Sequence, residues 1–94
     1  MTRWIAAYDI ADDRRRDRVA RLLQGYGTRV QASVFELLLD TDDLDRLERR
    51  VRRAIDPQTD RVRLYPVCAA CAAKVLDWGA EAGVPFDAPT VFLA

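Results

Sequence analysis

The sequence has no histidine, and its 94 residues include only two cysteines and a single lysine, Lys74. Without histidine there is no imidazole base, no histidine-ligated zinc and no histidine-dependent triad or nuclease chemistry. Catalysis would therefore have to use carboxylates, arginine, tyrosine, hydroxyl groups, thiols or a metal ion. No apolar run approaches the roughly 20 residues that span a bilayer, and the first residues lack the pattern of a secretory signal. We expect a cytoplasmic protein without a membrane segment.

The two cysteines, Cys68 and Cys71, form a CxxC pair. Such a pair is half of a zinc site, but the remaining ligands are missing from one chain. A redox CxxC would need a thioredoxin-like context, which the sequence lacks. Because free cysteines are commonly buried, we interpret the pair as two reduced, partly buried thiols.

Length and charge indicate one small domain that gains from self-association. We expect a single domain over residues 1–94, with a core at 1–67 and a C-terminal extension at 68–94. A domain of this size has a large surface for its volume, so pairing with a second copy would bury more apolar area. Net charge is zero, but residues 1–30 carry seven Arg against four Asp, whereas residues 31–60 carry five Arg against eight acids.

The hydrophobic pattern predicts the element order β-α-β-β-α-β. Leucines and valines recur at helical spacing in both predicted helices, and Gly25 and Gly27 would end the first. The expected elements are a strand at Arg3–Ile10, a helix capped by Asp12 or Asp13, two strands within Thr28–Asp40 joined by a bulge or tight connection at Gln31–Ser33, a helix capped by Thr41, and a strand at Asp60–Val67.

This order is typical of the ferredoxin-like α+β fold, in which an antiparallel sheet carries both helices on one face. After the last strand we expect a helical turn within Cys68–Leu76, a loop at Gly79–Pro89 and a short β segment at Thr90–Leu93. A strand beyond a complete fold must pair somewhere, and the edge strand of a partner copy is one solution.

Asp9 is the first candidate for chemistry, since it follows an apolar strand while Tyr8 points to the opposite face. A carboxylate at this place needs an arginine, backbone donors or a metal ion. A helix cap or salt bridge is an equally good interpretation from the residues alone. One carboxylate is a poor Mg²⁺ site, but two-fold symmetry would supply a second from another copy. Mg²⁺ there could activate a water against a phosphodiester without histidine.

Arginines and aromatic residues give the second set of candidates. Basic residues lie on or near the first helix, and Arg29 opens the next strand, as a phosphate-backbone reader requires. For Arg14, Arg15 and Arg21 we favour a solvated helix face. Tyr8 and Phe35 are either core residues or a pair that stacks bases, and composition leaves both possibilities open.

A series of short motifs resembles one known family. They are YDI at 8–10, DD at 12–13, R-x-R-V at 16–19, YG at 26–27, RVQ at 29–31, SVFE at 33–36 and LYP at 64–66. Each is weak alone, but together, in this order and spacing, they resemble the small CRISPR-associated adaptation protein, a family of metal-dependent endoribonucleases and endonucleases. The resemblance covers roughly residues 3–67, and residues beyond it match no pattern closely.

The resemblance implies a ferredoxin-like homodimer in which Asp9 of each copy is the catalytic, metal-binding acid, with Mg²⁺ shared between the two. Tyr8, Arg16, Arg18, Arg29 and Phe35 match positions that the family uses near that site, for nucleic-acid binding or support. The implied partners are nucleic acid, either duplex DNA spacer precursors or single-stranded RNA, and the larger CRISPR adaptation integrase.

There are three alternatives to a metal-dependent adaptation nuclease. One is a non-catalytic DNA-bridging scaffold in the adaptation complex. Another is a related toxin-type ribonuclease outside any CRISPR locus. A small-molecule regulatory domain of the same fold would need a glycine-rich ligand loop, and we identify none in the sequence.

Overall fold

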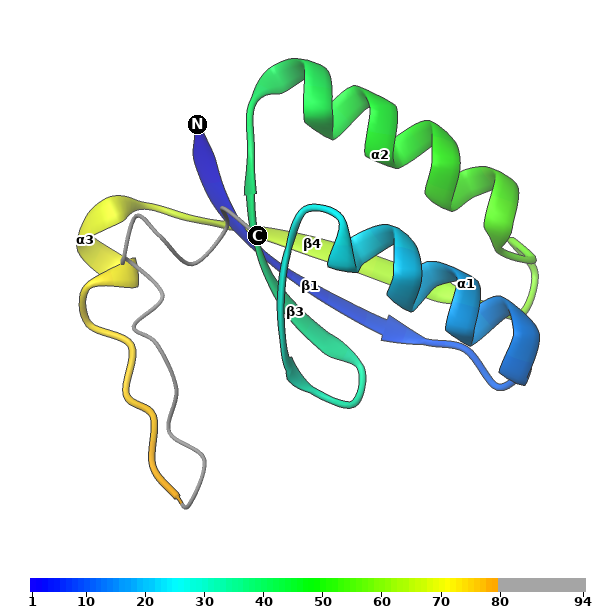
Figure 1. Cartoon of the computed structure of the whole chain (residues 1–94), viewed down its shortest axis with the longest axis horizontal. Coiled ribbons are helices and arrows are strands. Elements are labelled where there is room, and N and C mark those ends of the chain that lie inside the picture. Colours follow the sequence, from blue (N-terminus) through cyan, green and yellow to red (C-terminus); the bar gives the residue numbers. More distant parts are fainter. Residues whose placement is uncertain (80–94) are drawn as a thin grey trace.

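Residues 1–79, which the computed structural model describes, form a four-stranded antiparallel sheet with two long helices over one of its faces (Figure 1). The strand order is β2-β3-β1-β4, so β2 and β4 are the edges. This confirms the predicted ferredoxin-like order. The elements are β1 (Thr2–Asp9), α1 (Asp13–Gln24), β2 (Gly27–Gln31), β3 (Val34–Leu39), α2 (Thr41–Ala54), β4 (Arg61–Val67) and the short α3 (Ala69–Ala72).

The two faces of the sheet differ because side chains alternate along each strand. Ala6 and Tyr8 of β1 are buried under the helices, whereas Ile5 and Ala7 are only half-buried on the other side. We call the helix-covered side the helix face and the other side the bare face. From the strand register, strands β1, β3 and β4 contribute to the bare face Arg3, Ile5, Ala7 and Asp9 of β1, Val34, Glu36 and Leu38 of β3, and Arg61, Arg63, Tyr65 and Val67 of β4.

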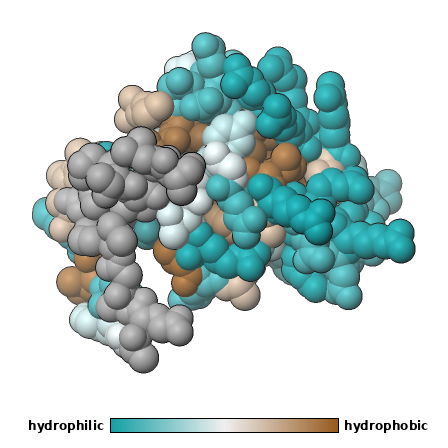
Figure 2. Space-filling model, in the orientation of Figure 1, coloured by the Kyte–Doolittle hydropathy of each residue, from teal (hydrophilic) through white to brown (hydrophobic). Residues whose placement is uncertain are grey.

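The core lies between the helix face and the apolar stripes of α1 and α2. Its largest fully buried side chains are Phe35, Leu23, Leu37, Leu39, Leu47 and Val19. The predicted stripes are therefore confirmed, with helical spacing directing these residues to the sheet. In Figure 2, hydrophobic residues show between the hydrophilic outer surfaces of the two helices. No helix within residues 1–79 is long and apolar enough to cross a membrane.

The helix caps agree with the sequence at α1 and differ at α2. Asp12 caps α1 by accepting the Arg15 backbone N–H at 2.9 Å. The predicted cap Thr41 is wrong, because Thr41 is already helical and Asp40 is the cap. Asp40 accepts the Asp43 backbone N–H at 2.7 Å, and the Asp43 carboxylate accepts the Asp40 N–H at 3.5 Å. This reciprocal capping box makes Asp40 the better cap.

The β2–β3 hairpin contains the tight connection that was one of the two predicted alternatives, and a register shift lies just before it. Residues 32 and 33 form the turn, and the register shifts between Arg29 and Gln31. Gly25 ends α1 as its C-cap, as expected. Gly27 instead belongs to β2, where a Cβ would lie 1.9 Å from the Glu36 carbonyl oxygen. Only glycine allows this close approach of the two strands.

After β4 the chain forms the expected helical turn, α3. Cys68 and Cys71 are free, as predicted, but both are exposed, so the expected partial burial is wrong. The turn directs Ala72, with 2% exposure, to the interior and leaves both sulfur atoms outside. The predicted loop beyond Gly79 and the predicted strand at Thr90–Leu93 lie outside the described residues.

Candidate functional site

Asp9 is exposed on the bare face, at the last position of β1. It lies directly opposite Arg61 in the antiparallel pairing of β1 with β4, so the two side chains share one face. Within residues 1–79 Asp9 forms no ion pair at 4.0 Å or less, and Arg61 forms none either. The end of the sheet therefore presents an exposed carboxylate beside an exposed guanidinium.

Arg61 was not among the site residues expected from the sequence, and neither was Arg63. Arg63 lies opposite Ala7 on the same face, and its guanidinium carbon is 5.0 Å from the centre of the Tyr65 ring. The alternation of charged and apolar residues along β4 was the signal that could have found them. It places every second side chain on one face, so Arg61 and Arg63 had to follow the face of Asp9 once β1 and β4 were paired.

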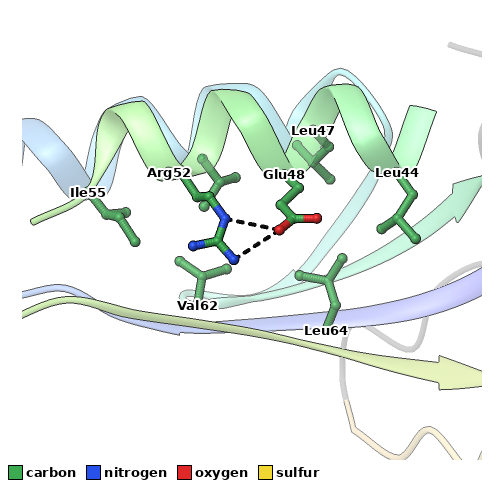
Figure 3. A pocket seen from close by; sticks show the side chains of 8 residues that line it. Leu44, Leu47, Glu48, Arg52, Ile55, Val62 and Leu64 are labelled. Carbon is green, nitrogen blue, oxygen red and sulfur yellow. Dashed lines mark hydrogen bonds and ion pairs between the residues drawn. The ribbon is translucent and has the colours of Figure 1, made fainter. Parts of the chain in front are cut away.

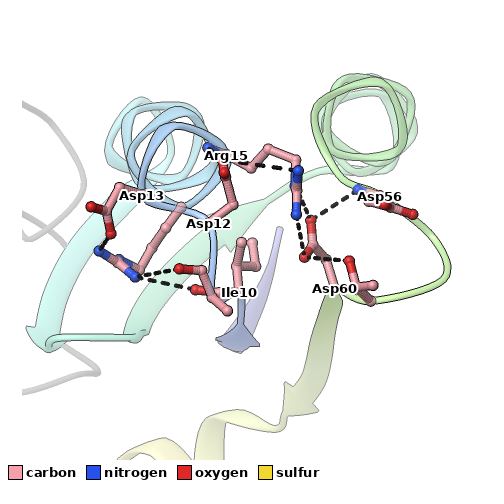
Figure 4. Close-up of polar contacts among 9 residues, drawn as sticks. Ile10, Asp12, Asp13, Arg15, Asp56 and Asp60 are labelled. Carbon is pink, nitrogen blue, oxygen red and sulfur yellow. Dashed lines mark hydrogen bonds and ion pairs between the residues drawn. The ribbon is translucent and has the colours of Figure 1, made fainter.

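Arg16 fixes the connection that follows Asp9. Its Nη1 donates to the backbone carbonyls of Ile10 at 3.3 Å and Ala11 at 3.4 Å. Its Nη2 pairs with the carboxylate of Asp13 at the start of α1, and Figure 4 draws all three contacts. Arg16 thus ties the β1–α1 connection to the helix and sets the backbone path next to Asp9.

Arg15 makes the ion pair with the most buried carboxylate. Its Nε donates to Asp60 Oδ2 at 2.7 Å and its Nη2 to Oδ1 at 3.3 Å, and the Asp60 side chain is only 1% exposed (Figure 4). Asp60 also accepts the Asp56 backbone N–H at 2.9 Å and the Thr59 hydroxyl at 3.2 Å. The Arg15 hydrogen bond is the main cause of a lowered Asp60 pKa, and Asp60 in turn raises the pKa of Arg15.

This pair overturns the interpretation of Arg15 as part of a solvated helix face. Arg14 and Arg21 are exposed on α1, as expected, and so is the candidate Arg18, which forms no ion pair in the described part of the chain. Arg15 differs because it points to the start of β4. It thereby joins α1 to the residue that precedes Arg61.

Tyr8, Phe35 and Arg29 come together on the helix face, on the opposite side of the sheet from Asp9. Phe35 is fully buried and Tyr8 is 6% exposed, which favours the core interpretation over base stacking. The Tyr8 hydroxyl donates to the Ala32 carbonyl at 3.0 Å and accepts from Arg29 Nη2 at 3.5 Å. The Arg29 guanidinium lies over the Phe35 ring, 5.2 Å from its centre. These three residues fasten the hairpin turn to the end of β1.

One chain supplies a single carboxylate to this site. Glu36 is on the bare face but pairs with Ile5, four residues from Asp9, or about 13 Å along the strand. Burial, and secondarily the charge of Asp77, raises the pKa of Glu36. In residues 1–79 no three acidic or thiol side chains cluster as a metal centre. A donor set of one carboxylate fits Mg²⁺ only if a second copy or a substrate phosphate completes it.

A separate apolar groove of about 320 Å³ lies between α2 and the edge strand β4 (Figure 3). Glu48 and Arg52, which both belong to α2, form an ion pair of 2.9 Å along the helix side of the groove. The groove is on the helix face, so it does not include Asp9. Its apolar lining is Leu44, Leu47, Val51, Ile55, Val62 and Leu64.

The sequence is similar to proteins of one family. The family model for CRISPR associated protein Cas2 matches residues 1–75. A relative from Rhodospirillum rubrum, "CRISPR-associated endoribonuclease Cas2 4", is 42% identical over 93 residues, covering 99% of this chain and 75% of its own. The "CRISPR-associated endonuclease Cas2 2" of Thermus thermophilus is 53% identical over 64 residues, covering 68% of this chain and 71% of its own.

Solved structures agree with the fold. The crystal structure of Streptococcus pyogenes Cas2 matches with a TM-score of 0.75 at 29% identity, over 82% of this chain and 99% of that one. A chain of a partial Cas6-RT-Cas1–Cas2 complex matches with a TM-score of 0.71 at 31% identity, over 82% of this chain and 90% of that one.

Proposed function

The chain belongs to the CRISPR-associated Cas2 family, and we propose that it is a metal-dependent endonuclease or endoribonuclease that works as a homodimer in spacer acquisition. The observation that carries this proposal is the place of Asp9, exposed at the end of β1 beside Arg61. A carboxylate next to a guanidinium suits hydrolysis of a phosphodiester, because one group can hold a metal while the other neutralises the phosphate.

The homodimer is proposed from the bare face. Ile5, Ala7, Val34, Leu38 and Val67 form a half-buried apolar area on a sheet side that no helix in the described residues covers. Packing this area against the same area of a second copy buries it from water and creates a two-fold axis. Asp9 and Arg61 lie at the end of this face, so they stay at the rim of such an interface.

The C-terminal segment is proposed to complete the dimer. Strand β4 is an edge of the sheet, and the apolar groove runs beside it on the helix face. Thr90–Leu93 of a second copy would pair with this edge and place apolar side chains against the groove. The apolar groove beside the β4 edge favours pairing with Thr90–Leu93 of a second copy, because an edge that stays in water would leave this groove exposed.

In this dimer Asp9 of each copy would hold Mg²⁺, which when bound supplies an activated water for attack on phosphorus. The chain's own residues do the rest. Arg61 holds the phosphate by charge-assisted hydrogen bonds. Arg16 fixes the backbone beyond Asp9, and Tyr8 fastens the hairpin turn beside it, so the carboxylates keep one geometry.

The proposed protein partner is the larger adaptation integrase, since a Cas1–Cas2 complex contains a chain of this fold. A second candidate is a non-catalytic DNA-bridging scaffold within that complex. The scaffold is favoured by the donor set of one chain. Among residues 1–79 no three acidic or thiol side chains gather as a metal site, so a chain without a second copy or a substrate phosphate offers only one carboxylate to a metal ion.

Paired cleavage assays separate the two candidates. Wild type, Asp9→Asn and the control Asp45→Asn, which changes an exposed acid on α2, are incubated with single-stranded RNA and duplex DNA under titrated Mg²⁺. A catalyst predicts Mg²⁺-dependent cleavage by wild type and Asp45→Asn that Asp9→Asn loses. Cleavage that persists in Asp9→Asn would refute the role of Asp9. Binding without cleavage by all three proteins would establish the scaffold instead.

A further inference from the structure

Cys68 and Cys71 lie on one exposed helical turn, directly after the last residue of β4. Cys68 is the N-cap of α3, and its Sγ accepts the Cys71 backbone N–H at an N···S distance of 3.4 Å. The Ala72 N–H donates to the Cys68 carbonyl at 2.9 Å and closes the turn. The sulfur of Cys68 is therefore held against Cys71.

This geometry is close to that of a disulfide. Residues three apart on a helical turn have Cβ atoms about 5–6 Å apart, and a disulfide needs about 3.5–4.5 Å. Cys68 has extended backbone angles and is the N-cap of α3, so the approach of about 1–2 Å that the disulfide needs falls at the end of the helix and not in its interior. Both thiols are exposed, so a reagent in solution reaches them without local unfolding.

The two thiols are chemically unequal. The backbone N–H of Cys71, followed by its side chain, lowers the pKa of Cys68, because these hydrogen bonds favour the thiolate. The interaction with Cys68 raises the pKa of Cys71. Since the thiolate is the nucleophile, Cys68 is suited to attack first and Cys71 to resolve the intermediate.

The chain lacks the thioredoxin-like context of a catalytic redox pair, but we propose that Cys68 and Cys71 are a reversible redox-modification site that a small-molecule disulfide of the glutathione type oxidises to an internal disulfide. The Cys68 thiolate attacks one sulfur of the disulfide, forms a mixed disulfide and expels the first glutathione thiolate. The Cys71 thiolate then attacks the Cys68 sulfur and expels the second. Two protein thiols are oxidised, one small disulfide is reduced to two thiols, and the two protons from the protein end on them.

This site is independent of the proposed nuclease. The two sites lie at opposite ends of β4. Asp9 is opposite Arg61, the first residue of this strand, whereas Cys68 follows Val67, its last residue. Closing the disulfide would fix the turn through which the chain leaves the sheet. Failure of either proposal therefore leaves the other unaffected.

The test uses the full chain, freed of metal by a chelator and equilibrated in buffers of stepwise oxidised-to-reduced glutathione ratio. Samples are quenched with acid, the remaining thiols are alkylated with N-ethylmaleimide, and intact masses are measured. We expect one transition from a doubly alkylated species to an unalkylated one that lacks two hydrogens. Persistent glutathione adducts, or two free thiols at ratios that oxidise a thioredoxin control, would overturn the proposal.

Two serine variants test the order of attack. Cys71→Ser should accumulate a stable glutathione adduct on Cys68, and Cys68→Ser should form its adduct several-fold more slowly at neutral pH. The alkylation rate of Cys71→Ser should also reach half its maximum at lower pH than that of Cys68→Ser. Equal rates and equal pH profiles would contradict the assignment of Cys68 as the attacking thiol. Both side chains are exposed, and far-UV circular dichroism checks that each variant folds.

Discussion

The two faces of the sheet are built from alternate residues of the same strands, yet they carry different properties. The helix face is almost entirely apolar and holds Phe35, Leu37 and Leu39 at 0–1% exposure. The bare face mixes half-buried apolar residues with Asp9, Glu36 and three arginines. One face holds the fold together, and the other presents chemistry and a surface for a second copy.

This difference shows how the candidate site residues divide. Asp9 and Arg61 belong to the bare face and contact solvent, whereas Tyr8 and Phe35 belong to the helix face and support the strand end from behind. Tyr8 and Asp9 are adjacent in the sequence, yet Tyr8 supports the fold and Asp9 faces solvent. Changes on the helix face should lower stability, and changes on the bare face should alter association and nucleic-acid chemistry while the monomer stays folded.

The largest stability effect is expected for Phe35→Ala on the helix face. Removing a fully buried aromatic ring should lower the free energy of unfolding by about 3–5 kcal/mol, through lost transfer energy and the cavity left behind. Urea unfolding at fixed protein concentration measures this loss. The bare-face comparison is Asp9→Asn, whose free energy of unfolding should stay within about 0.5 kcal/mol of wild type. A small loss in Phe35→Ala would remove the distinction between the faces.

The next effect tests the bare face as an interface. Ile5→Asp places a charge in the centre of the apolar area and should raise the dimer dissociation constant about 100-fold or more, since an unpaired charge would be buried. Ile5→Val keeps the area apolar and serves as the control. Sedimentation equilibrium measures both. Equal dissociation constants for the two variants would place the dimer interface elsewhere.

A smaller effect concerns the guanidinium beside Asp9. If Arg61 contacts a phosphate, Arg61→Ala should reduce the slope of log affinity against log salt by about 1 and weaken binding evenly across sequences. The matched control is Arg50→Ala, which removes an exposed arginine on α2. Fluorescence anisotropy over a salt series gives the slopes. The same slope for Arg61→Ala and wild type would exclude this contact.

The sequence predicted the features that depend on local periodicity. The stripe containing Val19 and Leu23 and the apolar residues of β1 and β3 follow from spacing alone, and so does the order of the elements. The cap of α2 was ambiguous because Asp40 and Thr41 are adjacent and both residue types cap helices. The partner Asp43 decided it, in place of the Glu or Gln of the usual capping box.

The site was harder to predict because it depends on strand pairing. Asp9 was found from its place after an apolar strand, but Arg61 became its neighbour only through the β1–β4 register. Arg15 and Asp60 are 45 residues apart in the sequence, so nothing local distinguishes Arg15 from the solvated Arg14 beside it. The exposure of both cysteines likewise depends on how α3 leaves the sheet.

The smallest predicted effect concerns the Arg15–Asp60 pair, which joins α1 on the helix face to the start of β4, next to Arg61 of the bare face. Folding lowers the pKa of Asp60 below its unfolded value of about 3.9. The stabilisation is therefore fully present above that pH and is lost as pH falls through the folded-state pKa. Asp60→Asn should be less stable than wild type at neutral pH, and the two should converge in acid. Urea unfolding at a series of pH values measures this, with Asp45→Asn, which changes an exposed acid on α2, as the comparison variant. A difference that stayed constant with pH would mean that packing, rather than the charge of Asp60, stabilises this end of the sheet.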